Sequence, residues 1–194
     1  MKNSAVTAWK KLKEIIKMDN VKKRKNIVLI GMMGAGKSTI AHLLDEKLKN
    51  FQYLDIDKEI EKLANKHIPE IFALHGEAHF RQLEHEMIAK YSNYHNQVIA
   101  TGGGVVENVE NIALLKQNGV IFYLSATAEE LYERVRKTSH RPLLQKENPK
   151  KILKDLIKKR EPYYKMADFE VNTKNKELLE IVQEIIEKYE TTLS

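Results

Sequence analysis

Apolar and polar positions follow two different rhythms along this chain. Short runs rich in Ile, Val, Leu and Phe predict β-strands at residues 26–30, 51–56, 98–100, 119–124 and 168–171. Between these runs, apolar residues recur at helical spacing, which predicts helices at residues 37–48, from 58 onward, and at 107–116, 128–136, 150–160 and 178–189. Alternating strands and helices are typical of a parallel sheet with helices on both faces. The pattern therefore predicts a three-layer α/β fold that binds ligands at the carboxyl ends of its strands.

One stretch departs from this alternation. Residues 68–94 are helical in pattern, long and polar, and they lie between two predicted strands where one crossover helix would suffice. We interpret the wider segment, about residues 57–95, as a helical insert that binds the substrate. His75 and His79 in this stretch suggest a metal site, but Gly76 interrupts the helical pattern and the His-Glu-x-x-His order is absent. Surface histidines are the favoured interpretation.

A basic extension, residues 1–25, precedes the first predicted strand. Residues 1–26 carry nine Lys or Arg and two acidic residues; because the whole chain has a net charge of +6, the remainder sums to −1. Val6, Trp9, Leu12 and Ile16 recur at helical spacing, which predicts a helix. Such a helix would pack on the domain or on a neighbouring chain, with attachment to a membrane surface as the alternative. A basic tail on a nearly neutral body argues against nucleic acid as a partner.

The composition narrows the class of protein further. The chain has 194 residues, of which 42% are hydrophobic and 31% charged, and this favours a single folded domain over residues 26–194. It has no cysteine, which excludes disulfide scaffolds, thiolate zinc sites and cysteine nucleophiles. No apolar run approaches the roughly 18 residues that would span a bilayer. We therefore expect a cytoplasmic protein without a membrane span.

The clearest chemical signal is the segment GMMGAGKST, which begins at Gly31. It has the spacing of a phosphate-binding loop, with a predicted strand before it and a predicted helix after it. Glycines let backbone N–H groups turn toward phosphate oxygens, and the helix N-terminus adds positive potential. The lysine neutralises the β- and γ-phosphate oxygens, and the serine hydroxyl ligates Mg²⁺. The segment predicts an ATP site with Mg²⁺ as cofactor, formed by Gly34, Ala35, Gly36, Lys37, Ser38 and Thr39.

Two further groups of residues follow predicted strands. Asp55 and Asp57 lie at the end of the second strand, where residues two apart point to the same side, so both carboxylates can face one site. One can hold a magnesium-bound water while the other receives a substrate hydroxyl. The alternative is that Asp57 caps the helix that follows. Three glycines, residues 102–104, follow the third strand and allow backbone amides to approach a ligand closely.

Together these residues resemble the shikimate kinase family of small-molecule kinases, which has the nucleoside-monophosphate-kinase-like P-loop fold. The resemblance covers roughly residues 26–190 and rests on six motifs in the family's order: GMMGAGKST, LDIDKEIE, IPEIFALHGEAHFRQLE, ATGGGVV, RPLL and KREPYY. It implies transfer of the γ-phosphoryl group of MgATP to the 3-hydroxyl of shikimate. It also implies a mobile lid over ATP, at about residues 137–149.

The resemblance also implies a role for individual residues. Asp55 would join Ser38 in serving the magnesium, and Asp57 would bind the substrate hydroxyls and act in catalysis with Lys37. The other implied contacts are Arg81, Gly103 and Arg160 to shikimate, and Arg141 on the lid to ATP. Arginine suits the carboxylate of shikimate because its planar guanidinium pairs with a carboxylate through two hydrogen bonds.

Several questions stay open at this point. The adenine-stacking position falls at either Arg136 or Lys137, and the segment 172–176 lacks the proline that some family members place against adenine. A gluconate-type sugar-acid kinase and a catalytically silent nucleotide-binding protein are the rival functions. We expect shikimate and ATP as the only partners, and a monomer by analogy with small kinases of this fold.

Overall fold

Five parallel strands form the centre of the molecule. The computed structural model describes residues 23–136 and 148–193. The strands are β1 Asn26–Ile30, β2 Gln52–Asp55, β3 Gln97–Ala100, β4 Gly119–Ser125 and β5 Phe169–Asn172. They pair in the order β2-β3-β1-β4-β5, and every pair is parallel. All residues of β1, β3 and β4 are buried, as is typical of parallel strands that helices cover on both faces.

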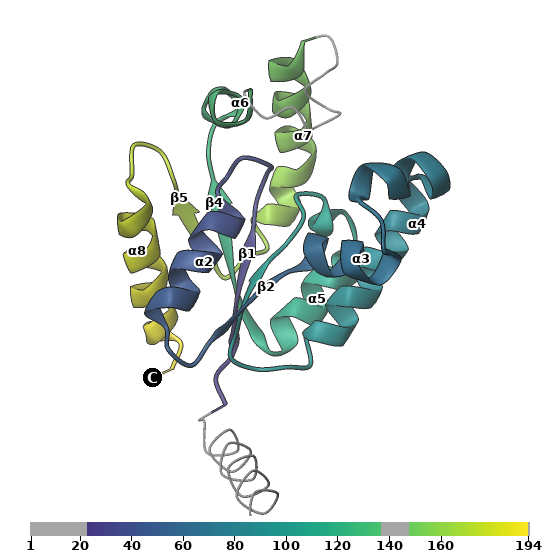
Figure 1. Ribbon diagram of the computed structural model, residues 1–194. Coiled ribbons are helices and arrows are strands. Elements are labelled where there is room, and N and C mark those ends of the chain that lie inside the picture. The colour runs from purple at the N-terminus through teal and green to yellow at the C-terminus, as the bar shows by residue number, and fades with distance from the viewer. Residues whose placement is uncertain (1–22, 137–147, 194) are drawn as a thin grey trace, which may run out of the picture.

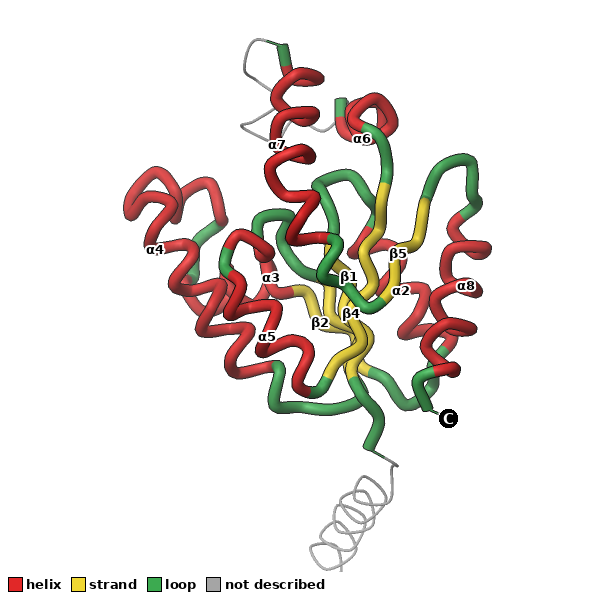
Figure 2. The backbone as a smooth tube through the Cα atoms, turned by 180° about the vertical axis from the view of Figure 1, so that it is seen from behind, coloured by secondary structure: helices red, strands yellow, loops and turns green. Residues whose placement is uncertain are grey.

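Helices form a layer on each side of this sheet (Figures 1 and 2). One face is covered by α2 Lys37–Lys47 and α8 Leu178–Thr191, and the other by α5 Val109–Gln117 together with α3 Ile56–Ala64 and α4 Ile68–Tyr91. The three-layer α/β architecture that the sequence predicts is therefore confirmed.

Alternation along the strands divides the apolar core in two. Ile27 and Leu29 of β1 pack with α2 and α8, whereas Val28 and Ile30 pack with α3, α4 and α5. Successive side chains of a strand point to opposite faces, so β1, β3 and β4 each contribute to both clusters. The sheet is thus held from both sides, and its carboxyl edge is a rigid base for the loops that follow the strands.

Two more helices stand at this carboxyl edge, α6 Ala128–Val135 and α7 Pro149–Tyr164 (Figure 1). The sequence pattern ends the second of these at residue 160, yet the helix continues past Pro162 to Tyr164. Its last turn persists because Tyr164 is fully buried in the core. Pro162 forfeits one hydrogen bond of the helix for this packing.

The other differences from the predicted elements are local. The helix expected at 107–116 is divided into a 3₁₀ turn, η1 Val105–Glu107, and α5, because Asn108 caps α5 by accepting a hydrogen bond from the N–H of Glu110 at 3.0 Å. The interruption that the sequence predicts at Gly76 is present inside α4, where this residue has φ 78° and ψ 174°. Within the described ranges, no helix is long and apolar enough to cross a membrane. The helix predicted in the N-terminal extension and almost all of the expected lid lie outside these ranges.

Candidate active site

The phosphate-binding loop joins β1 to α2. Its glycines are needed both for the backbone conformation of the loop and for its close packing. Gly34 and Gly36 have positive φ angles of 83° and 89°, a region that glycine enters without steric cost. A β-carbon on Gly34 would lie 2.6 Å from Cγ1 of Val135 in α6. The loop is therefore packed closely against α6 as well as against the strand ends.

Lys37, the first residue of α2, lies along this loop. Its Nζ donates hydrogen bonds to the carbonyl oxygens of Gly31 at 2.8 Å and Met32 at 3.1 Å. Ser38 and Thr39 are exposed on the first turn of α2, while Ala35 is buried. A cation and the N-terminus of an 11-residue helix thus lie at one loop, an arrangement that attracts phosphate groups.

Asp55, the last residue of β2, accepts hydrogen bonds through both of its carboxylate oxygens. Its Oδ2 accepts hydrogen bonds from the hydroxyls of Ser38 at 2.9 Å and Tyr53 at 3.0 Å. Its Oδ1 accepts from the backbone N–H groups of Asp57 at 3.1 Å and Lys58 at 3.4 Å, which makes Asp55 the N-cap of α3. The alternative that Asp57 is the cap is therefore wrong. Ser38 and Asp55 thus bring together two hard oxygen atoms, the type of ligand that Mg²⁺ prefers.

Asp57 and Glu84 each bury a carboxylate oxygen that has no hydrogen-bond partner in the part of the chain that the structure describes. Both oxygens lie against Gly102, because a β-carbon there would be 2.9 Å from Oδ1 of Asp57 and 3.0 Å from Oε1 of Glu84. Burial raises the pKa of Asp57 to about 6, and the charges of Asp55 and Glu84 add to this effect. Burial also raises the pKa of Glu84. Buried acceptors of this kind call for hydrogen-bond donors from a ligand.

The three glycines that follow β3 each contact a different part of the site. Gly102 lies against the two acids, and a β-carbon on Gly103 would be 3.3 Å from the backbone nitrogen of Met33 in the phosphate-binding loop. A β-carbon on Gly104 would be 2.7 Å from Cζ of Arg81. None of the three has a positive φ. At these positions close neighbours, rather than backbone conformation, therefore disfavour a larger residue.

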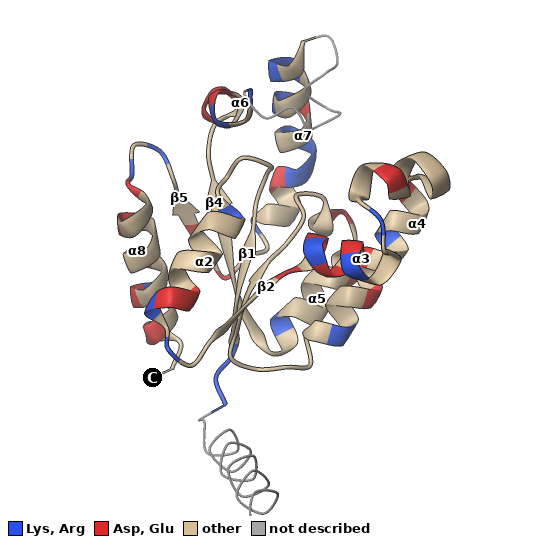
Figure 3. Ribbon diagram, viewed as in Figure 1, with Lys and Arg blue, Asp and Glu red and all other residues tan. Residues whose placement is uncertain are grey.

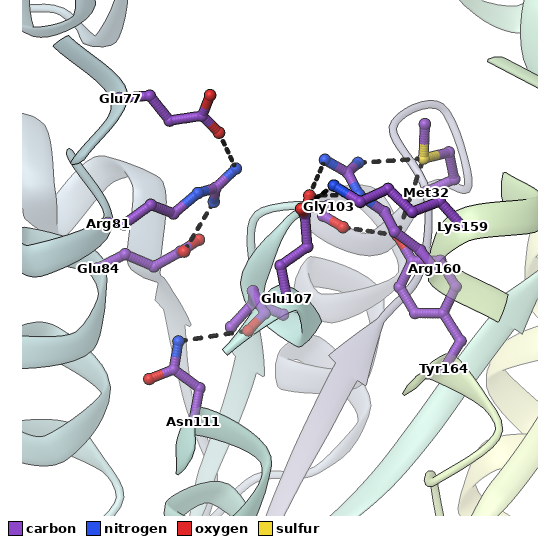
Figure 4. Close-up of polar contacts among 11 residues, drawn as sticks. Met32, Glu77, Arg81, Glu84, Gly103, Glu107, Asn111, Lys159, Arg160 and Tyr164 are labelled. Atoms are coloured by element: carbon purple, nitrogen blue, oxygen red, sulfur yellow. Dashed lines mark hydrogen bonds and ion pairs between the residues drawn. The ribbon is translucent and has the colours of Figure 1, made fainter. Parts of the chain in front are cut away.

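Arg81 of α4 is held by two acids of the same helix (Figure 4). Its Nη1 donates to Oε2 of Glu84 at 2.8 Å, and its Nη2 donates to Oε1 of Glu77 at 3.1 Å. The side chain of Glu84 is 1% exposed and that of Arg81 27%. The guanidinium therefore lies half-buried with its orientation set by Glu84.

Residues 102–104, the glycine loop, separate Arg81 from Arg160 of α7, which is paired with Glu107 (Figure 4). Arg160 is buried, and its Nε and Nη2 both donate to Oε1 of Glu107, at 2.8 and 2.5 Å. One helical turn later, the hydroxyl of Tyr164 donates to the carbonyl oxygen of Gly103 at 2.6 Å. These contacts attach the end of α7 to the glycine loop.

The sequence-predicted site residues in the described ranges thus meet at the carboxyl ends of β1, β2 and β3. Figure 3 shows acidic positions where β2 runs into α3, with basic positions on α4 and α7 to either side. Arg141 lies outside the described residues.

The two arginines at the end of α6 have different partners. Arg136 pairs with Glu133 on the surface, where the two side chains are 50% and 53% exposed. Arg134 instead donates to Oγ1 of Thr173 at 3.0 Å and to its carbonyl oxygen at 3.2 Å, which joins α6 to the loop after β5. Lys137 lies outside the described residues. Arg134 is therefore held against the loop that follows β5, whereas Arg136 lies on the surface.

Sequence reasoning missed three residues that organise the site: Glu84, Glu107 and Tyr164. Glu84 stands three residues after Arg81, a helical spacing that could have indicated the ion pair. Tyr164 belongs to the KREPYY motif, but the motif does not show that its hydroxyl reaches Gly103. Nothing in the sequence marks Glu107, because its partner Arg160 is 53 residues away.

Comparisons with known proteins identify the family to which this chain is similar. The sequence model described as shikimate kinase matches residues 33–190. A shikimate kinase of Thermodesulfovibrio yellowstonii is 47% identical over 166 residues, which cover 86% of this chain and 95% of that relative. A shikimate kinase of Caldanaerobacter subterraneus is 44% identical over 165 residues, which cover 85% of this chain and 96% of that relative.

The solved structures point the same way. A shikimate kinase from Acinetobacter baumannii in complex with shikimate matches with a TM-score of 0.84 and 35% identity, over 90% of this chain and 98% of that one. A gluconokinase from Sinorhizobium meliloti matches with a TM-score of 0.54 and 15% identity, over 88% of this chain and 95% of that one. The second likeness shows a shared fold and nothing more.

Proposed function

The chain belongs to the shikimate kinase family, and we propose how its own residues carry out the family's reaction. It is an ATP-dependent kinase that transfers the γ-phosphoryl group of ATP to the 3-hydroxyl of shikimate, giving 3-phosphoshikimate and ADP. The observation that carries the residue assignments is the position of the glycine loop. It contacts Asp57 through Gly102, the phosphate-binding loop through Gly103, and Arg81 through Gly104.

Arg81 and Arg160 bind the carboxylate of shikimate in this proposal. They come from α4 and α7 on opposite sides of the glycine loop. Each is already held by an acid, Glu84 or Glu107, which sets the orientation of its guanidinium. A carboxylate between two oriented guanidinium groups forms charge-assisted hydrogen bonds that a neutral substrate cannot form. The carboxylate end is therefore where the site selects its substrate.

Asp57, Glu84 and the backbone of Gly103 bind the ring hydroxyls. The two buried oxygens without partners, Oδ1 of Asp57 and Oε1 of Glu84, are acceptors, and the hydroxyls of shikimate are donors that would satisfy both. Asp57 accepts the proton of the 3-hydroxyl while that oxygen forms a bond to the γ-phosphorus and the bond to the ADP oxygen breaks. A carboxylate kept from water and close to the acceptor hydroxyl is suited to this proton transfer.

The phosphate-binding loop and α2 hold ATP. The residues proposed to contact the nucleotide are Gly34, Ala35, Gly36, Lys37, Ser38 and Thr39. Lys37 leaves the carbonyls of its own loop, to which it donates in this structure, and neutralises charge on the transferred group. Arg141 is proposed to add positive charge from the lid.

The hydroxyl of Ser38 and the carboxylate of Asp55 are the proposed Mg²⁺ ligands. Their oxygens lie 2.9 Å apart in a hydrogen bond, and an oxygen-only donor pair fits a hard cation. The ion, when bound, neutralises phosphate charge during transfer. Because the hydroxyl of Tyr53 also donates to Asp55, this carboxylate is kept in place by its own chain.

The release of ADP, measured with shikimate, with gluconate and without an acceptor, tests this function. Shikimate should support turnover at micromolar or lower enzyme concentration, and the other two reactions should stay at background. Release of ADP with gluconate alone would favour the sugar-acid kinase, and no release with any acceptor would favour a silent nucleotide-binding protein. The same assay with Arg160→Ala tests the carboxylate assignment, since the KM for shikimate should rise while that for ATP is unchanged.

We also propose that the protein acts as a monomer in the cytoplasm. All site residues assigned above come from one chain, and ATP is a substrate. Light scattering of the purified protein should give a mass near 22.5 kDa, and a dimeric mass would contradict the monomer. Fractionation of cells that produce the protein tests the location.

A further inference from the structure

Glu107 is the residue outside the assigned site that the structure connects most closely to it. It is the last residue of η1, the 3₁₀ turn that directly follows the glycine loop. Its backbone N–H donates to the carbonyl oxygen of Gly104 at 3.0 Å. Its two carboxylate oxygens have separate partners: Oε1 accepts from Arg160, and Oε2 accepts from Nζ of Lys159 at 2.6 Å. Its side chain is 26% exposed, and that of Arg160 is 8% exposed. This carboxylate therefore stands between the glycine loop and α7.

The way in which Glu107 meets Arg160 leaves part of the guanidinium available. A guanidinium offers two edges that can each form a pair of hydrogen bonds, one made of Nε and Nη2 and one made of Nη1 and Nη2. Glu107 occupies the first edge. Among the described residues, the contact recorded for Nη1 is the sulfur of Met32 at 3.5 Å, and a thioether is only a weak acceptor. The second edge is thus the one that a substrate carboxylate can take.

We propose that Glu107 is a positioning residue that fixes the guanidinium of Arg160 through its Nε and Nη2 edge and presents the Nη1 and Nη2 edge to the carboxylate of shikimate. Lys159 holds the second oxygen of Glu107 and limits its movement. The backbone hydrogen bond to Gly104 holds Glu107 at a fixed position relative to the glycine loop, whose backbone at Gly103 is proposed to bind the substrate. This inference rests on the proposed role of Arg160 in binding shikimate.

The opposite role for Glu107, competition with the substrate, would change the kinetics differently. If Glu107 occupied the place of the substrate carboxylate, it would compete with shikimate, and removing it would strengthen binding. The geometry argues against competition, because Glu107 uses the Nε side of the guanidinium and is itself held by Lys159. The two roles predict changes of opposite sign in the KM for shikimate.

Steady-state kinetics of four variants test the proposal, with thermal unfolding measured in parallel. Glu107→Ala should raise the KM for shikimate about tenfold, the effect of losing one oriented charge-assisted contact, with the KM for ATP within twofold of the wild type. Glu107→Asp keeps the charge but withdraws it by one methylene, so it should also raise the KM for shikimate. Glu107→Gln keeps the length and an acceptor oxygen and should recover most of the binding. Glu161→Ala removes a charge from the neighbouring residue of α7, which pairs with Lys165, and should match the wild type.

The outcomes separate this inference from the proposed function. An unchanged or lowered KM for shikimate in both Glu107→Ala and Glu107→Asp would overturn the positioning role. An equal rise in the KM for ATP and a lower thermal midpoint in both variants would also overturn it, because Glu107 would then only stabilise the fold. If Arg160→Ala leaves the KM for shikimate unchanged, the assignment of Arg160 itself fails. If Arg160→Ala raises that KM and the Glu107 variants do not, only the inference about Glu107 fails.

Discussion

Gly104→Ala is the most discriminating change for this site, because the three atoms nearest to the new methyl group would all belong to Arg81. A β-carbon at this position would lie 2.7 Å from both Cζ and Nη1 of Arg81, whereas non-bonded atoms of this kind prefer roughly 3.5–4.0 Å. The guanidinium must therefore move by about 1 Å. It is the end of a flexible side chain that is 27% exposed, so we expect the side chain to move and the fold to persist.

The size of the effect follows from what Arg81 loses. A shift of about 1 Å breaks the geometry of a paired contact with the substrate carboxylate, and loss of one hydrogen bond to a charged group costs about 1.5–3 kcal/mol. The KM for shikimate should rise by about tenfold to a hundredfold or more, since about 1.4 kcal/mol corresponds to a factor of ten. The KM for ATP should stay within about twofold, because the atoms nearest to the new methyl group belong to Arg81 rather than to the phosphate-binding loop.

Steady-state kinetics in both substrates and thermal unfolding of the same samples measure this. Gly103→Ala is the matched comparison, because its β-carbon would be 3.3 Å from the backbone nitrogen of Met33 and should disturb ATP binding. A Gly104→Ala enzyme with the KM of the wild type for shikimate would refute the reasoning, since it would mean that Arg81 can move without cost to binding.

Four further changes have distinct expected results. Arg81→Lys keeps the charge but loses the planar pair of donors, so the KM for shikimate should rise about tenfold or more in initial-rate measurements, and an unchanged KM would remove its carboxylate role. Asp57→Asn should lower kcat by roughly 10²–10⁴ and raise the thermal midpoint of the ligand-free protein, because it removes a buried charge; near-normal turnover would exclude Asp57 as the base. Tyr164→Phe leaves the carbonyl oxygen of Gly103 without its 2.6 Å donor and should cost about 1–3 kcal/mol of unfolding free energy in urea titrations; an unchanged midpoint would contradict this. Burial disfavours the charged form of Glu107, but hydrogen bonds from Lys159 and Arg160 outweigh it and lower the pKa of this carboxyl. The stability that the ionised carboxylate contributes is therefore present above its ordinary pKa and is lost as the pH falls through the folded-state pKa. The difference in unfolding free energy between wild type and Glu107→Gln should shrink in acid, and a difference that grows in acid would contradict the lowered pKa.

The sequence was informative wherever the signal is local. Apolar periodicity located the strands and helices to within a few residues, and the limits of β1 at Asn26–Ile30 agree in full. The spacing of glycine, lysine and serine predicted the loop between β1 and α2, because phosphate binding needs those groups at fixed separation along the chain. Asp57, Arg81 and Arg160 came from motifs whose residues are close together in sequence, and the structure brings all three to the carboxyl edge of the sheet.

Roles that depend on contacts between distant segments could not be predicted from the sequence. The sequence left open whether Asp57 caps the helix that follows β2, but the backbone path at the end of β2 makes Asp55 accept the N–H groups of that helix. The three glycines predicted close approach to a ligand, yet only the packing shows that each has a different neighbour.

The sequence by itself therefore determined the class of fold, the phosphate-binding loop and the family, because hydrophobic period and motif spacing are properties of short stretches of chain. The tertiary structure decided how the substrate end is organised. Arg160 and Glu107 are 53 residues apart, and Tyr164 and Gly103 are 61 apart. These pairs form only because α7 packs beside the loop that follows β3, and the energy of such a contact depends on burial and orientation that no single segment encodes.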